Sequence, residues 1–291
     1  MTLATEIDPE AFAVTDHHVY WTESYGTGTT ANLLRAGVDG SAQPEIVGTI
    51  DQGSFAINGS VVLYDKGESP MLGELGVDGE AGKATSNGIS LGSVAGAWFE
   101  GHTLFASSPD ATALVELPLG GAAVVASVAP SRIAAVAATD GIAYVATLDD
   151  SNVGSIVSFT DGSTTPTVVA TDVGVVRQIA PTTNYVYFTA TATDGHAALY
   201  YVLPDGSGKS VVVDDYGGSF ALDGSNVYFA RSGSLTRLDR NTGATTVLGS
   251  IDPAVSPAVV AHGGNVYWAY GSYVFYPGQP LRPGAIVTTC K

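Results

Sequence analysis

The sequence has few of the features that would support a disulfide framework, a nucleic-acid interface or a membrane span. Cys290 is the single cysteine among 291 residues, so no internal disulfide can form. There are only 11 Lys and Arg against 28 Asp and Glu, a formal charge of −17, whereas phosphate binding needs clustered cations. This charge balance leads us to expect no nucleic-acid partner. No run of about 20 apolar residues is present, so we also expect no membrane insertion.

The amino-terminal segment also lacks the pattern of a secretory signal. MTLATEIDPEAF has no basic stretch followed by an apolar one, so the sequence indicates either a cytosolic chain or a mature domain whose signal has been removed. The composition is rich in Thr, Ser and Gly and poor in Lys, which slightly favours a secreted or periplasmic location.

What the sequence does contain is glycine, valine and short aromatic runs in a repeating order. GSFAINGS at 53–60 returns as GSFALDGS at 218–225, which is 165 positions later. Runs such as HVYWTE, IAYVAT and NVYWAY recur throughout the chain, with spacings of 43, 41, 40, 43, 41 and 39 residues between anchor positions. The anchors are Tyr20, Leu63, Leu104, Tyr144, Tyr187, Tyr228 and Tyr267. A period of this length indicates a repeat architecture.

Each repeat has the same internal order of apolar strands and turns. Asp-Gly turns between hydrophobic runs, at Asp39, Asp78, Asp161 and Asp205, are typical of hairpins. Seven residues before each anchor stands a small residue, as the crowded inner strand of a blade requires: Ala13, Ala56, Ala97, Ala137, Ala180, Ala221 and Val260. We therefore predict an all-β, seven-bladed β-propeller of four-stranded antiparallel blades, forming a single domain over residues 1–291.

The last repeat lacks a clear fourth strand, and either chain end offers one. The strand is supplied by AIVTTC at 285–290, or TLATEI at 2–7 crosses over to close the ring. We favour closure by the amino-terminal strand, because it ties the two ends together and leaves no exposed sheet edge.

The anchor strands resemble a known group of repeats. VYWTE, VYFAR and VYWAY, together with RLDRNTGATTVL at 237–248, are similar to YWTD-type and related bacterial propeller repeats. Glu23 stands where YWTD repeats have aspartate, and we count seven repeats where YWTD domains usually have six. The resemblance covers nearly the whole chain as repeat architecture. It implies the propeller fold, and members range from receptor domains to secreted proteins.

Ligands of propellers usually bind near the channel mouth, on the face that carries the loops between strands two and three and between blades. Arg177 and Gln178 stand there in a first strand whose counterparts are mostly small, so Arg177 could hold a ligand carboxylate or form an ion pair with Glu10 or a loop aspartate. Tyrosines for stacking on a ligand are Tyr25, Tyr216 and Tyr270.

Acidic loops on the same face suggest further chemistry. Asp149, Asp150 and Asn152 in DDSNVG, and the pair Asp214 and Asp215, are candidate Ca²⁺ ligands or, alternatively, ordinary polar turns. His196 beside Asp194 is a candidate general acid or base.

Two functions follow from these residues. The first is a non-catalytic module that binds a carbohydrate, a small ligand or a protein through the loop face around the channel mouth. The second is a hydrolase or lyase with an acidic, metal-assisted site at the same place. No serine nucleophile elbow, P-loop or H-E-x-x-H motif is present, which favours the binding module.

Overall fold

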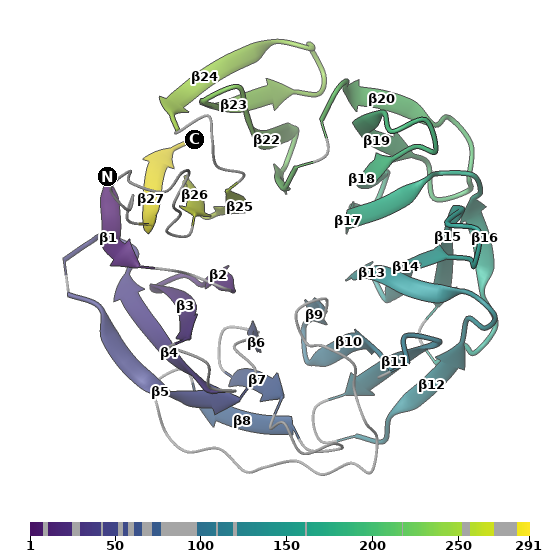
Figure 1. The fold of residues 1–291 in the computed structure, drawn as a ribbon, viewed down its shortest axis with the longest axis horizontal. Coiled ribbons are helices and arrows are strands. Elements are labelled where there is room, and N and C mark those ends of the chain that lie inside the picture. The colour runs from purple at the N-terminus through teal and green to yellow at the C-terminus, as the bar shows by residue number, and fades with distance from the viewer. Residues whose placement is uncertain are drawn as a thin grey trace, which may run out of the picture. The chain divides into compact units, whose positions relative to one another are not determined.

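The described part of the chain consists of strands and turns. The computed structural model describes residues 1–7, 11–24, 30–41, 43–51, 55–57, 61–65, 72–76, 98–108, 110–118, 121–160, 162–216, 218–251, 257–270 and 284–291. Within these residues lie six four-stranded sheets and one three-stranded sheet, and their strands pair antiparallel (Figure 1). No helix in the described ranges has the length and apolar character needed to cross a membrane.

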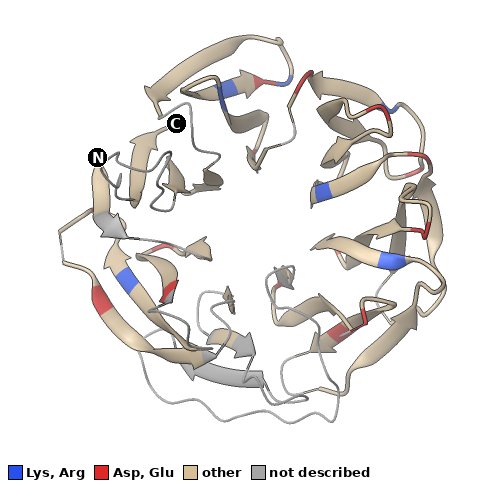
Figure 2. Ribbon diagram, in the orientation of Figure 1, with Lys and Arg blue, Asp and Glu red and all other residues tan. Residues whose placement is uncertain are grey.

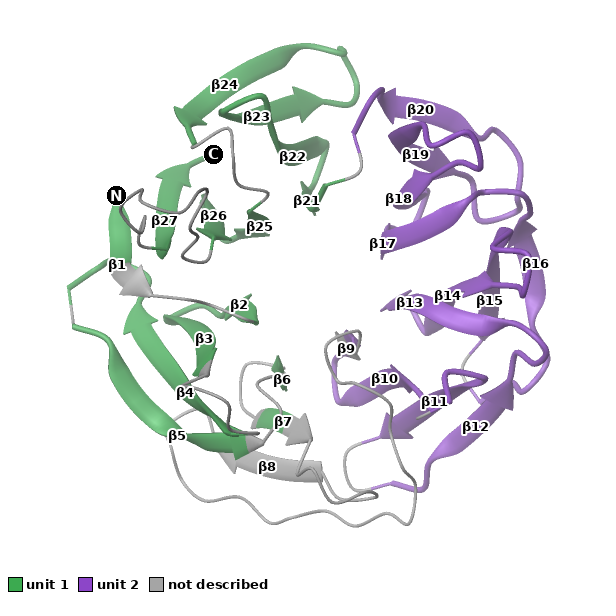
Figure 3. Cartoon of the chain, in the orientation of Figure 1, with its two compact units in different colours: residues 1–67, 73–83, 218–291 green, residues 68–72, 84–217 purple. Residues whose placement is uncertain are grey.

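The contacts divide the chain into two compact units, coloured separately in Figure 3. Unit 1 comprises residues 1–67, 73–83 and 218–291, and unit 2 comprises residues 68–72 and 84–217. Each unit is built from whole sheets, apart from Leu72 at the start of β8.

Unit 1 contains four sheets. The first runs β2 to β5, with the bounds Phe12–Val14, His18–Ser24, Thr30–Gly37 and Glu45–Asp51. The second runs β6 to β8, with the bounds Phe55–Ile57, Val61–Asp65 and Leu72–Gly76. The third runs β21 to β24, with the bounds Phe220–Asp223, Asn226–Arg231, Ser234–Asp239 and Thr245–Ser250. The fourth has the order β1-β27-β26-β25, with the bounds Thr2–Ile7, Gly284–Cys290, Asn265–Tyr270 and Ala258–His262.

Unit 2 contains three sheets. The first runs β9 to β12, with the bounds Trp98–Glu100, Thr103–Ser107, Ala113–Pro118 and Val124–Ser127. The second runs β13 to β16, with the bounds Arg132–Thr139, Ile142–Leu148, Gly154–Thr160 and Thr167–Ala170. The third runs β17 to β20, with the bounds Val175–Pro181, Val186–Thr191, Ala197–Val202 and Ser210–Val213.

The expected closure by the amino-terminal strand is confirmed. Strand β1 pairs antiparallel with β27, from Thr2 opposite Val287 to Ile7 opposite Gly284. The carboxy-terminal candidate is a strand as well, and it takes the third place in the sheet rather than the fourth. Both chain ends therefore belong to one blade (Figure 1). The fourth strand expected after β8 falls on residues 77–97, which lie outside the described residues.

The small residues predicted for the inner strands lie in those strands. Ala56, Ala137, Ala180 and Ala221 are buried, and Ala13 and Val260 are half-buried. Ala97 lies outside the described residues. The large anchor residues lie on the neighbouring second strands, opposite these small residues. Tyr20, Tyr228 and Tyr267 are almost fully buried. The repeat pattern of the sequence is thus a packing pattern, with small side chains toward the inner strands and aromatic ones between neighbouring sheets.

The Asp-Gly turns are structural, but their geometry is not that of the type I′ turn, which needs positive φ at both central residues. Gly40 and Gly206 have φ of 68° and 86°, whereas the preceding Asp39 and Asp205 are not among the residues with positive φ. Each aspartate instead accepts hydrogen bonds from the amide and hydroxyl two residues later, at 2.7 to 3.0 Å. These bonds lower the pKa of both carboxyl groups. Asp78 and Asp161 lie outside the described residues.

Candidate functional site

One edge of the second and third sheets of unit 2 gathers most of the predicted site residues that the structure describes. In a four-stranded antiparallel blade, the start of the first strand lies beside the turn between strands two and three and beside the exit of the fourth strand. We call this the loop edge. In the second and third sheets of unit 2 it comprises the starts of β13 and β17, the turns at 149–153 and 192–196, and the connections at 171–174 and 214–216.

Arg177 lies at the loop edge, in a β-bulge of the inner strand β17. Val176 pairs with Ala190 and Gln178 with Thr189, so Arg177 is the additional residue between two ladder pairs. Its side chain is exposed, and it has no hydrogen bond or ion pair within the described part of the chain. Figure 2 shows this position as a blue segment on β17. A bulge re-aims the side chain of its additional residue, so the strand presents a guanidinium outward from the sheet.

The bulge also changes the hydrogen bonding of the neighbouring strand. In the first sheet of unit 1, Oγ1 of Thr22 accepts a hydrogen bond of 3.2 Å from the amide of Ala11. The corresponding Thr189 lies opposite the half-buried Gln178, and its Oγ1 is buried with no hydrogen-bond partner among the described residues. A buried hydroxyl without a partner is costly and calls for an explanation. Here the bulge at Arg177 interrupts the ladder at this point.

The structure brings together three of the predicted polar residues in the third sheet of unit 2. Nε2 of His196 lies 2.7 Å from Oδ1 of Asp214, and the His196 amide donates to Oδ1 of Asp194 at 2.9 Å. Tyr200, which the sequence reasoning missed, lies near this group and stacks on Phe188 with 5.4 Å between ring centroids. Burial, followed by the charges of Asp214 and Asp194, raises the pKa of Tyr200, which keeps its hydroxyl protonated.

This group is exposed rather than enclosed. The side chains of His196 and Asp214 are 44% and 72% exposed. Water therefore screens their interaction.

The predicted Ca²⁺ ligands are held in turns. Oδ1 of Asp149 accepts hydrogen bonds of 2.8 Å from the amides of both Ser151 and Val153, and Asn152 has φ of 59°. Asp150 is exposed beside it, and Asp215 adopts a φ of 52°. Within the described residues, no three His, Cys, Asp or Glu side chains are grouped so that they could hold a metal ion. The geometry matches the polar-turn alternative.

The predicted stacking tyrosines have different environments. Tyr216 is 6% exposed and its amide donates to the carbonyl of Ala197, so its ring offers little surface to a ligand. Tyr270 ends β26 in unit 1, where it is half-buried and packs against a core cluster that includes Trp268. Tyr25 lies outside the described residues.

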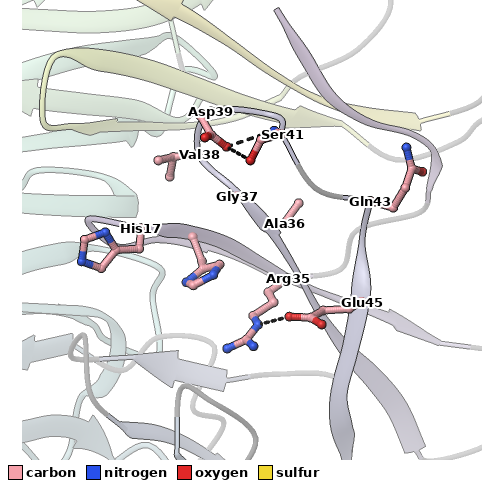
Figure 4. A pocket seen from close by; sticks show the side chains of 10 residues that line it. His17, Arg35, Ala36, Gly37, Val38, Asp39, Ser41, Gln43 and Glu45 are labelled. Carbon is pink, nitrogen blue, oxygen red and sulfur yellow. Dashed lines mark hydrogen bonds and ion pairs between the residues drawn. The ribbon is translucent and has the colours of Figure 1, made fainter.

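A surface pocket lies at the opposite edge of the first sheet of unit 1, where the sequence predicted only turn residues. Its volume is about 300 Å³, and its walls come from the β2–β3 and β4–β5 turns and the adjoining strands (Figure 4). Arg35 and Glu45 point toward each other there, with Nε of Arg35 2.6 Å from the carboxylate. Oδ1 of Asp39 is held by Ser41.

The charged groups of this pocket are largely paired with one another. Burial opposes the charge of Arg35, but hydrogen bonds to Glu45 and Tyr20 outweigh it and raise the pKa of the guanidinium. An incoming anion would have to displace Glu45. Arg177, which has no such partner in the described chain, is therefore the better candidate for binding a ligand.

Comparison with known proteins gives the fold. No protein-family model and no curated protein sequence matches the chain. Among solved structures, the S511A mutant of puromycin hydrolase complexed with PGG matches with a TM-score of 0.69 and 12% identity, over 90% of this chain and 50% of the hydrolase. The chain thus spans about half the length of that enzyme.

Two further matches extend over nearly the whole of both chains. The WD40 repeats of RRP9 give a TM-score of 0.66 at 12% identity, and the WD40 propeller domain of Doa1 gives 0.65 at 14%, each over 98% of this chain and 96% of the other. The fold is an all-β propeller. Its blades are four-stranded and antiparallel, and identities this low carry the propeller architecture alone.

Proposed function

We propose that this propeller is a non-catalytic binding module whose ligand or protein partner docks at the loop edge that carries Arg177. The observation that supports this most strongly is the exposed guanidinium on a bulge of an inner strand, with no partner in the described chain. An exposed cation at a bulge offers paired hydrogen-bond donors without first breaking an internal ion pair. A rigid sheet behind a short loop edge is a frame on which binding residues are commonly displayed.

We further propose that the binding module is one domain with seven blades. Seven repeats are present in the sequence, and the described residues form six four-stranded sheets and a three-stranded one. The full-length matches to the WD40 domains of RRP9 and Doa1 are consistent with a single propeller of this length. The resemblance to YWTD-type repeats belongs to the same proposal.

A thermal-shift panel tests the binding proposal. The wild-type chain is heated with saccharides, carboxylates, phosphate and short peptides, alongside the variants Arg177→Ala and Lys209→Ala. Lys209→Ala is the matched control because it removes the same charge at the opposite edge of the same sheet. A ligand at 100 times its Kd stabilises the fold by about 2.7 kcal/mol, or roughly 4 to 5 °C for a chain of this size.

The expected result is that a stabilising ligand loses its effect in Arg177→Ala and keeps it in Lys209→Ala. A ligand that stabilises all three proteins equally binds elsewhere and contradicts the assignment to the loop edge. A panel without a stabilising member contradicts the binding proposal for these ligand classes.

A hydrolase or lyase is the second candidate, and the 2.7 Å contact between His196 and Asp214 is the observation that favours it. A carboxylate that orients an imidazole is part of many acid–base sites. The test is turnover of ester, amide and glycoside model substrates with Ca²⁺ or with EDTA, comparing the wild type with His196→Gln. Activity that disappears in His196→Gln would favour the enzyme, and activity that persists in the variant comes from a contaminant.

A further inference from the structure

A second exposed arginine lies at the loop edge beside the first. Arg132 is the first residue of β13, the inner strand of the neighbouring sheet in unit 2. Its side chain is exposed, and within the described residues it has no hydrogen bond or ion pair. Figure 2 shows a blue segment on β13 as well as on β17. Arg132 was missed in the sequence because the residues of each blade were considered separately.

The two strands are packed side by side and share their irregularity. Ala137 of β13 and Ile179 of β17 belong to one buried cluster. Strand β13 has a bulge at Ala134, between the pairs Ile133–Thr147 and Ala135–Ala146, which is the position equivalent to Arg177. The same two positions are exposed in both strands: Arg132 and Ala134 in β13, and Val175 and Arg177 in β17.

This register places the two arginines at exposed positions of neighbouring inner strands, with a diagonal offset. Arg132 corresponds to Val175, so the arginines are displaced by two residues along neighbouring strands, or roughly 7 Å of strand length. That offset suits two anionic groups joined by a short linker better than one anionic group shared between both side chains.

The described carboxylates of the loop edge form no ion pair with these arginines, and two of them are engaged in other contacts. Asp149 accepts from the amides of Ser151 and Val153, and Asp214 contacts the ring of His196. Neither arginine forms an ion pair with a described carboxylate. The overall charge of −17 disfavours the binding of a large polyanion. A small dianion that makes the same two contacts is repelled less by the protein.

We propose that Arg132 and Arg177 together bind a small dicarboxylate, with one carboxylate on each guanidinium. This inference rests on the proposed binding function of the loop edge and names its ligand class. The planar guanidinium donates two parallel hydrogen bonds to a carboxylate, which a lysine cannot reproduce.

Calorimetric titration with succinate, acetate and inorganic phosphate tests the proposal. We expect succinate to bind the wild type at least about tenfold more tightly than acetate, since each charged hydrogen-bonded contact contributes a factor of that order. Arg132→Ala and Arg177→Ala should each reduce succinate affinity about tenfold or more. In both variants the advantage of succinate over acetate should disappear. Arg177→Lys should fall between the wild type and the alanine variant, and Lys209→Ala should bind like the wild type.

Each contrary result has a distinct meaning. Equal affinities for succinate and phosphate, or for succinate and acetate, overturn the dicarboxylate assignment. Unchanged succinate affinity in Arg132→Ala overturns the two-arginine site and leaves binding at Arg177 standing. No succinate binding, combined with another ligand whose stabilisation depends on Arg177, refutes this inference and keeps the proposed function. Succinate affinity unchanged in both alanine variants refutes both.

Discussion

The pairing of β1 with β27 predicts that a side chain near the amino terminus contributes strongly to stability. Leu3 is 7% exposed and packs in a cluster with Trp21, Tyr267 and Ile286. Leu3→Ala removes buried methyl groups and leaves a cavity, which costs 2–5 kcal/mol in well-packed cores. Because β1 is an outer strand that can partly relax inward, we expect about 2–3 kcal/mol, or a fall in Tm of roughly 3–5 °C.

Urea unfolding followed by tryptophan fluorescence measures this loss, since Trp21 lies in the same cluster as Leu3. Thr2→Ala is the matched control, because Thr2 is in the same strand with an exposed side chain and should change stability by no more than about 0.5 kcal/mol. A loss below about 0.5 kcal/mol for Leu3→Ala, or equal losses for both variants, would refute the argument that β1 completes the core of this blade.

Two further predictions concern backbone crowding and pH. A Cβ at Gly154 would lie 1.8 Å from the carbonyl oxygen of Gly174, so Gly154→Ala should destabilise unit 2 by about 1–3 kcal/mol or more in urea. Gly249→Ala, with 3.9 Å to the nearest ring atom, should have a much smaller effect, and equal losses would contradict the clash. The pKa values of Asp39 and Asp205 are lowered by hydrogen bonds from the serines two residues later, so their stabilisation is present above about pH 4 and is lost as the pH falls below it. The urea midpoint should therefore fall less steeply from pH 5 to 3 in the Asp39→Asn, Asp205→Asn double variant, and parallel profiles would refute this assignment.

Much of the fold was predictable because packing restricts which residue types can stand at each position of the repeat. HVYWTE at 18–23 became β3 and IAYVAT at 142–147 became β14, each within a residue of its predicted bounds. Alanines seven residues before the anchors lie in the inner strands, as the period required. The closing strand was predicted from the need to cover an edge, and β1 fills that place.

The site was less predictable because it depends on register and burial. Arg177 was selected from its sequence position, but its bulge depends on how β17 aligns with β18, which no single segment encodes. Tyr216 looked like a loop residue available for stacking, whereas the connection after β20 turns its ring into the interior. Arg132 was missed because the residues of each blade were considered separately. The pocket beside Arg35 was missed because side chains from two separate turns form it.

The arrangement of the two chain ends also determines how the last blade responds to mechanical force. Met1 and Thr288 exchange hydrogen bonds between their backbone groups, and Lys291 follows directly after β27. Because β1 and β27 run antiparallel, a pull on residues 1 and 291 loads the pair from the same end. The strands would peel apart one hydrogen bond at a time instead of shearing together. Tension applied through the termini should therefore open this blade at low force.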